Sequence, residues 1–261
     1  MTRSIKVSTK FRLGEVLRQD FSEINLGKYT LHRSPNEHLG SLKTELLLNF
    51  IDEWKEGQNG SNPEKEGEIV GIFTGDGSQY FAKGGHYQVN VHFGGHRKEY
   101  ALYVQKLFSD YFCKKFQLSN LNDGKLRLRT NSKDIFHYFK NYIEYNSKEK
   151  HCTVNLKTLN IPMKFKVGFI KGLVDTDGSV LYDKHDDAVR IFYYTTSEKL
   201  AEQISSILRE LSIKNTCICR TDKKGRKPLY VVRVLEKEVY KFLNIVKPFK
   251  QKLLKGPVVQ W

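Results

Sequence analysis

Two nine-residue stretches, Ile69–Gly77 (IVGIFTGDG) and Ile170–Gly178 (IKGLVDTDG), decide the fold of this 261-residue chain. Each has glycine at its third position within an apolar run, and an aspartate directly before a terminal glycine. Asp76 and Asp177 are therefore equivalent positions, 101 residues apart. A duplicated unit that ends a helix with a carboxylate brings two acids together across a pseudo-two-fold axis. We expect such a pair to serve metal-assisted chemistry on a two-stranded substrate.

Both stretches are predicted to be helices that pack closely against each other. Small residues recur at a spacing of four on one face of each helix, namely Gly71 and Gly75, and Gly172 and Thr176. Such spacing lets two helix backbones approach. The terminal glycines are expected to end the helices with a positive φ. Carboxylates at adjacent helix C-termini repel each other unless cations neutralise them, and Mg²⁺ suits both carboxylates and phosphate oxygens.

The elements that follow each stretch also occur twice. Leu107 matches Leu208, and Arg129 matches Arg233, at offsets of 101 and 104 residues. The predicted fold class is α+β, with two pseudo-symmetric αββαββα halves packed through their motif helices. Three domains are predicted. Residues 1–62 are an N-terminal extension with one amphipathic helix and a linker, residues 63–160 are the first half, and residues 161–261 are the second half.

The N-terminal extension has one clear helical signal. Ser34–Glu37 is a capping box, and apolar residues follow at helical spacing as far as Trp54. Turn-forming residues at Gly57–Pro63 then indicate a linker. Residues 1–65 match no part of the duplicated unit, so their role stays open.

The charge of the chain indicates a polyanionic partner. Lys and Arg number 44 against 29 Asp and Glu, a formal net charge of +15. Residues 1–66 hold 10 basic and 10 acidic residues, so the excess lies with the duplicated unit. Nucleic acid is the usual partner at this charge, and a basic but merely solvated surface is the alternative.

The remaining composition bears on the compartment. No apolar run approaches the length of a membrane span, and the N-terminal residues lack a signal-peptide core. Four cysteines form no CxxC pair, so a zinc site is not expected. We expect an intracellular protein, in the cytoplasm or nucleoid or encoded in an organelle, that is neither secreted nor membrane-bound.

Alternating polar residues predict a surface that follows DNA. In the strand Lys125–Thr130, Arg127 and Arg129 share one face, while leucines occupy the other. A sheet with a basic, polar face fits the major groove of DNA. The basic loop Lys223–Lys227 is typical of a phosphate-contacting turn or of a solvated hairpin tip.

These motifs resemble those of the single-chain, two-repeat LAGLIDADG homing endonucleases over about residues 64–255. The resemblance implies antiparallel sheets that form a saddle over double-stranded DNA. It also implies hydrolysis of both strands across the minor groove, with short 3′ overhangs. Thr74 departs from the family, which usually has Asp there, although that position is not the metal ligand.

The resemblance also implies roles for individual residues. Asp76 and Asp177 are expected to bind a divalent metal together with Gly75 and Thr176, and to act in catalysis with a polar residue after the second strand and with lysines. His96 fits the polar position in the first half, with Thr196 as a weaker counterpart, and Lys157 and Lys250 or Lys252 fit the lysine positions. Residues expected to contact DNA are Ser78, Tyr80, Gln88, Asn90, His92, Arg97, Arg127, Arg129, Ser179, Tyr182, Lys184, Arg190, Tyr194, Arg220, Lys224, Arg226 and Arg233.

The function predicted from these motifs is site-specific cleavage of a long asymmetric DNA site by a Mg²⁺-dependent endonuclease acting as a monomer. Mn²⁺ is expected to substitute, and Ca²⁺ to bind without cleavage. The alternatives are an intron maturase that binds RNA on the same fold, and a DNA-binding protein that no longer cleaves. The retained pair of acids favours the nuclease.

Overall fold

The computed structural model describes residues 62–81, 85–157, 161–221 and 227–254, and three short strands near the N-terminus. The chain divides into two compact units, Met1–Ser61 and Asn62–Trp261. In the first unit the described strands form a sheet in the order β1-β3-β2, where β2 and β3 pair as an antiparallel hairpin. The bounds of these strands are β1 Arg3–Ser4, β2 Glu23–Leu26 and β3 Tyr29–His32. The predicted helix of this unit lies outside the described residues.

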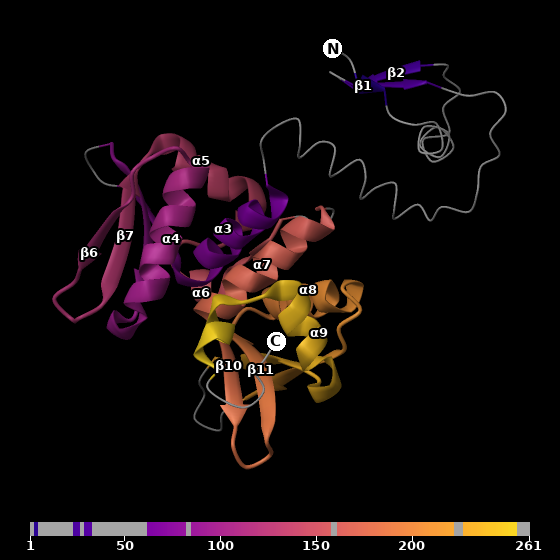
Figure 1. Cartoon of the computed structure of the whole chain (residues 1–261). Helices are drawn as coiled ribbons and strands as arrows, with labels where there is room; N and C mark the ends of the chain where they lie inside the picture. Colours follow the sequence, from indigo (N-terminus) through magenta and orange to yellow (C-terminus); the bar gives the residue numbers. More distant parts are fainter. Residues whose placement is uncertain are drawn as a thin grey trace. The chain divides into compact units, whose positions relative to one another are not determined.

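The second unit contains the two repeats of the sequence (Figure 1). In the first repeat, an antiparallel sheet has the strand order β4-β5-β7-β6. Its elements are α3 Pro63–Asp76, β4 Gly77–Phe81, β5 Tyr87–Phe93, the 3-10 turn η1 Gly95–Arg97, α4 Lys98–Tyr111, β6 Gln117–Asn120, β7 Leu126–Asn131 and α5 Lys133–Tyr142.

The second repeat has the same order of elements and the equivalent sheet order, β10-β11-β13-β12. Its elements are α7 Met163–Thr176, β10 Gly178–Asp183, β11 Ala188–Thr195, α8 Glu198–Glu210, β12 Asn215–Arg220, β13 Leu229–Val234, the 3-10 turn η2 Glu236–Glu238, α9 Val239–Val246 and the 3-10 turn η3 Phe249–Leu253. The predicted α+β class and the two αββαββα halves are therefore confirmed.

The strand register confirms the duplication residue by residue. Ser78 pairs with Asn90, which pairs in turn with Arg129. In the second repeat the corresponding ladder is Ser179, Phe192 and Arg233. Equivalent positions therefore carry different side chains.

A short connection links the two repeats. It pairs β8 (Ile143–Glu144) with β9 (Asn155–Leu156) and carries the short helix α6 (Lys150–Thr153) between them. The sequence pattern did not predict these elements, and their position matters for the site described below.

The motif helices lie side by side at the centre of the unit (Figure 1). The first begins as its sequence predicts, because the side chain of Asn62 accepts from the backbone N–H of Lys65 at 3.1 Å and Pro63 follows at the first helical position. The predicted positive φ at the motif end is wrong, since Gly77 is extended with φ −82°. Glycine is required there for space: a Cβ would lie 2.3 Å from the carbonyl oxygen of Phe73.

The apolar faces of helices and sheets join in one continuous core. Its largest fully buried side chains are phenylalanines, from Phe73 on the first motif helix to Phe169 on the second. Among the described residues, no helix is long and apolar enough to cross a bilayer.

Candidate functional site

The contact between the motif helices is a ladder of small residues. A Cβ on Gly71 would lie 2.3 Å from the carbonyl oxygen of Phe169, and one on Gly172 would lie 2.4 Å from that of Glu68. One turn earlier, Gly67 and Gly168 meet the opposite backbone at 2.0 and 1.9 Å by the same measure. Any side chain larger than hydrogen would push the helices apart. The predicted small-residue contact is therefore present, and it extends one turn further than the motif itself.

This close contact brings the ends of α3 and α7 together, and with them the two acids. A Cβ on Gly75 would lie 2.2 Å from Oγ1 of Thr176 and 3.1 Å from Oδ2 of Asp177. Burial, followed by the charge of Asp177, raises the pKa of Asp76 to about 6. Burial likewise raises the pKa of Asp177. The expected pair of mutually repelling carboxylates is present at the helix ends.

Two lysines lie beside the acids in equivalent positions. Nζ of Lys250 donates to the carbonyl oxygens of Val174 and Thr176 at 3.0 and 3.1 Å, and to that of Gly178. Nζ of Lys150 donates at 2.7 Å to the carbonyl oxygen of Phe73, the residue equivalent to Val174. It also donates to Gly77, the equivalent of Gly178, at 2.5 Å.

The position of these lysines has an electrostatic consequence. Burial lowers the pKa of both Lys150 and Lys250 to about 8, while Asp76 and Asp177 act in the opposite direction. Each ammonium group thus satisfies the last carbonyls of one motif helix and partly balances the carboxylates. The arrangement places one lysine beside the carboxylates at the end of each motif helix.

Lys157 was expected at the first-half lysine position, but Lys150 lies there instead. Lys157 is exposed just after β9, and its backbone N–H donates to the carbonyl oxygen of Tyr142. Lys150 lies on α6, in the connection between the repeats. The motif alone could not find it, since the connection has no counterpart at the end of the chain where Lys250 lies.

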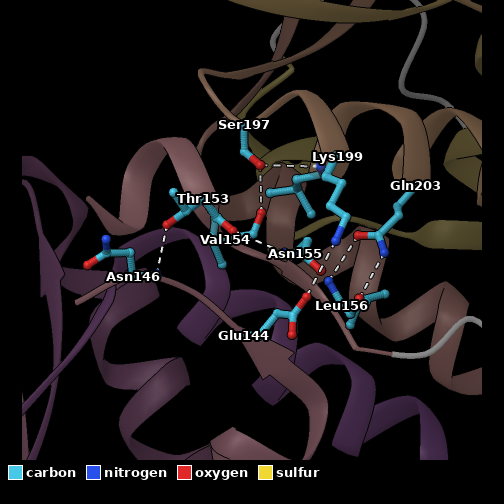
Figure 2. Close-up of polar contacts among 10 residues, drawn as sticks. Glu144, Asn146, Thr153, Val154, Asn155, Leu156, Ser197, Lys199 and Gln203 are labelled. Carbon is cyan, nitrogen blue, oxygen red and sulfur yellow. Dashed lines mark hydrogen bonds and ion pairs between the residues drawn. The ribbon is translucent and has the colours of Figure 1, made fainter. Parts of the chain in front are cut away.

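The connection that carries Lys150 is fixed to the second repeat (Figure 2). The side chain of Gln203 on α8 bonds both the N–H and the carbonyl of Leu156 at 2.9 Å. The hydroxyl of Ser197, the N-cap of α8, donates to the carbonyl oxygen of Val154 at 2.7 Å. A residue bound to the end of the first motif helix is thus held in place by the second half.

Arg97 is a further cation at the site, and among the described residues of the second half no arginine takes an equivalent place. Its Nη1 lies 3.7 Å from Oδ2 of Asp76, and its guanidinium lies 4.7 Å from the ring centre of Tyr100. Its Nη2 donates to the carbonyl oxygen of Asp175. Arg97 was expected to contact DNA, and the structure places it beside the first carboxylate. The neighbouring His96 is exposed on η1.

Asp175 fixes the C-terminal segment that carries Lys250. Its carboxylate is fully buried and accepts from the backbone N–H groups of Phe249 and Lys250 at 2.8 and 2.9 Å. Burial raises its pKa to about 6, although these hydrogen bonds act in the opposite direction. At the equivalent position Thr74 donates back to the carbonyl oxygen of Val70 instead. The first half thus has Thr74 in place of an aspartate, and its lysine, Lys150, comes from α6 and not from a segment held by such an aspartate.

An open cleft of about 550 Å³ borders the site on the side of the second half. Its lining includes Asp177, Lys150, His151 and Thr196. The hydroxyl of Thr196 donates to the carbonyl oxygen of His151 at 2.7 Å, so this expected polar position lies beside the cleft. The cleft gives a substrate access to the second carboxylate.

The donor set suits a hard divalent metal that is completed by its substrate. Among the described residues, no group of three or more His, Cys, Asp or Glu side chains could hold a metal. Two carboxylates and nearby backbone carbonyls are the ligands present, and Mg²⁺ is typically bound by one or two carboxylates with water and phosphate. Burial and the charge of Asp177 raise the pKa of Asp76, and a bound cation would act on it in the opposite direction.

Each sheet has an outer face, defined as the face opposite the buried core side chains. The pairing places most of the predicted DNA-contacting residues on these faces. Tyr182 is an exception, since it pairs with buried Val189 on the core side and its hydroxyl donates to Asp187. Lys184 lies in the exposed turn after β10. Lys224 and Arg226 fall outside the described residues.

The comparisons with known proteins agree with this architecture. Residues 164–247 match the family model of a LAGLIDADG-like domain. The second repeat is therefore similar to a LAGLIDADG-like domain, and the duplicated unit has the fold of the LAGLIDADG endonuclease structures compared below, as the sequence predicted.

Particular relatives can be named. The homing endonuclease I-DmoI of Desulfurococcus mucosus is 24% identical over 194 residues, which cover 68% of this chain and 84% of that protein. The uncharacterized protein MJ1054 of Methanocaldococcus jannaschii is 23% identical over 177 residues, 64% of this chain but 19% of that protein. Crystal structures of I-DmoI with DNA and Ca or Mn superpose with TM-scores of 0.53 and 0.51, at 22% and 21% identity. They cover 75% and 70% of this chain, and 94% and 96% of those chains.

Proposed function

We propose that this chain is a site-specific homing endonuclease that makes a double-strand break in a long, asymmetric DNA site. The observation that carries the proposal is the pair of carboxylates, Asp76 and Asp177, brought together at the ends of two helices in direct contact. The similarity to I-DmoI, whose structures are complexes with DNA, supports the choice of substrate.

Asp76 and Asp177, together with the carbonyl oxygens of Gly75 and Thr176, would hold the divalent metal, which we propose to be Mg²⁺. When bound, the metal supplies charge stabilisation at the scissile phosphates and makes a bound water more acidic. The carbonyl oxygen of Thr176 also accepts a hydrogen bond from Nζ of Lys250 at 3.1 Å. This oxygen would therefore bind the metal through its other lone pair. Structures of I-DmoI in the presence of Mn, Ca and Mg support a divalent cation.

The cations around the acids have separate roles. Lys150 and Lys250 are already held by carbonyl oxygens at the two helix ends, so they need little reorganisation to stabilise charge on a phosphate oxygen. Arg97 lies only on the Asp76 side, where it can contact a phosphate of one strand. For His96, exposed on the same turn, we propose the role of orienting a water and moving its proton. We propose that hydrolysis occurs on both strands and leaves short 3′ overhangs.

The two active-site halves lie in one chain, so the proposed enzyme acts as a monomer. The outer faces of the two sheets differ in side-chain chemistry, and an asymmetric site follows from that difference. The +15 charge supplies the sequence-independent part of the affinity.

Selection of cleaved sites from a random DNA library in Mg²⁺ tests the proposal. The wild-type chain should yield one asymmetric consensus, and Asp76→Asn and Asp177→Asn should yield none while still binding the wild-type site. Asp110→Asn, an exposed aspartate on α4, is the matched control and should behave as the wild type. Absence of any cleaved site with wild-type protein that binds RNA specifically would favour the maturase alternative instead.

A further inference from the structure

The outer faces of the two sheets differ in the kind of contact that they can make. Every outer position of the first sheet carries a polar or charged group. The strand register assigns to this face Ser78, Tyr80, Gln88, Asn90, His92, Gln117, Ser119, Arg127, Arg129 and Asn131. Such a face can hydrogen-bond to base edges along its whole length.

The outer face of the second sheet is mixed, with polar side chains at seven of its thirteen positions and an apolar strip between them. Six side chains on it have no polar group, and the register assigns them as Leu181, Ala188, Phe192, Ile218, Leu229 and Val231. Leu181 and Ile218 are 39% and 50% exposed. Val231 is buried, but it is not part of the main core. Its pairing partners, Tyr194 on β11 and Ile218 on β12, lie with it on the outer face. Exposed apolar side chains in a contiguous strip indicate a surface that is covered when the protein acts.

Two of the arginines on this second face already have partners. Nε of Arg190 lies 3.2 Å from Oδ2 of Asp183. Arg233 bonds Glu236 at 2.7 Å, and its guanidinium lies 5.8 Å from the ring centre of Phe192. Both guanidinium groups are thus partly occupied by acidic neighbours. The second face therefore offers base edges both apolar contacts and hydrogen bonds, whereas the first offers polar groups at every outer position.

The position of the strip identifies what covers it. The strip is continuous with the site, because Ser179 directly follows the motif and pairs with Phe192, and Leu229 lines the cleft with Asp177. Arg220, at the end of β12, adds a cation at its edge. A polyanion bound at the carboxylates would thus extend over this face with its phosphates near the arginines.

In the major groove of DNA the apolar group on a base edge is the 5-methyl group of thymine, and apolar side chains are its natural contacts. We propose that the two halves of the DNA site are read by different chemistry. The first sheet reads hydrogen-bonding edges, and the second sheet, through the Phe192–Ile218–Val231 strip, selects thymine methyl groups. This inference rests on the proposed function and adds the sequence preference of one half-site.

The expected effect can be given as a change in affinity. Burying one methyl group contributes about 0.8 kcal/mol, which corresponds to a factor of about four in affinity. Replacing thymine by deoxyuridine removes only this methyl group and leaves the hydrogen-bonding edges intact. Each contacted thymine in the second half-site should therefore lose about fourfold in affinity on substitution.

The experiment uses the full-length protein and its selected site. Arg129 lies on the first sheet, so Arg129→Ala should relax the base preference of the half-site that this sheet contacts. The other half-site is then the one that the second sheet contacts. Deoxyuridine is then placed at each thymine in turn, and the Kd is measured. We expect losses of about fourfold in the second half-site and of less than about twofold in the first. In the Ile218→Ser variant, deoxyuridine at the thymine that Ile218 contacts should no longer reduce DNA affinity. Deoxyuridine at the other thymines should still reduce it.

Leu102→Ser is the matched control, because Leu102 is 48% exposed on α4 and belongs to neither sheet. It should keep the wild-type pattern. Equal losses in both half-sites, or none in the second, would overturn the inference while leaving the proposed nuclease intact. Failure to select any site would overturn both. If Ile218→Ser left DNA affinity unchanged but abolished self-association in sedimentation, the strip would be a contact between copies of the chain.

Discussion

Asp76→Asn should stabilise the protein in the absence of metal. The pKa of Asp76 is raised from 3.8 to about 6 by burial and by Asp177, and its side chain is 24% exposed. At 1.36 kcal/mol per pKa unit, its ionised form costs about 3 kcal/mol of folding free energy at pH 7.5. Asparagine removes that cost. For a unit of this size the melting temperature should rise by about 5 °C or more.

Because the pKa of Asp76 is raised and not lowered by folding, the stability gained in Asp76→Asn should depend on pH. The pKa of Asp76 is higher in the folded than in the unfolded chain, so the stabilisation from its protonated form is complete below pH 3.8 and is lost as the pH rises through about 6. The gain from Asp76→Asn should therefore be largest at pH 7.5 and fall to roughly half at pH 5. Thermal melts in metal-free buffer at both pH values measure it.

Asp110→Asn is the control for this prediction, since Asp110 is exposed and pairs with Lys106 on the surface of α4. Its melting temperature should stay within about 1 °C of the wild type at both pH values. Added Mg²⁺ should stabilise the wild type more than Asp76→Asn, because a ligand stabilises the state that binds it. An Asp76→Asn variant that melts no higher than the wild type at pH 7.5, or whose gain is independent of pH, would refute the electrostatic account.

Three further predictions concern other parts of the molecule. Lys150→Met should slow cleavage of both strands about 100-fold with little loss of DNA affinity, whereas Lys157→Met should cleave at the wild-type rate in the same single-turnover assay. Gly71→Ala should destabilise the protein by about 3 kcal/mol in urea unfolding, because its Cβ would lie 2.3 Å from a backbone oxygen of the facing helix; an unchanged midpoint would show that the helices can separate at no cost. DNA affinity should fall on the order of 10³-fold between 50 and 200 mM salt, and a nearly flat response in a titration would contradict extensive phosphate contact.

The sequence predicted the features that repeat and missed those that do not. Two motifs in register predicted the paired helices, because apolar periodicity and glycine spacing report directly on a local contact. Lys150 could not be found this way, since its position depends on hydrogen bonds from Gln203 and Ser197 to a connection outside the repeat. The role of Asp175 was missed because its partners are backbone groups 74 and 75 residues away.

Other differences have local causes. Tyr182 was assigned to the DNA-facing side, but the face of a strand residue depends on register, and Tyr182 pairs with Val189 on the core side. The hairpin of β2 and β3 in the first unit was also missed, although only two residues separate Leu26 from Tyr29 in the sequence, which is a common hairpin spacing. Alternation on both sides of such a turn is the signal that could have identified it.

The central claim is that Asp76 and Asp177 form one shared site that serves both DNA strands. Strand-resolved single-turnover cleavage of the selected site, labelled separately on each strand, tests it most directly. The account predicts that Asp76→Asn and Asp177→Asn each abolish most cleavage of both strands while specific binding is retained. If either variant cleaved both strands at near wild-type rate in Mg²⁺, the shared carboxylate site proposed here would be contradicted.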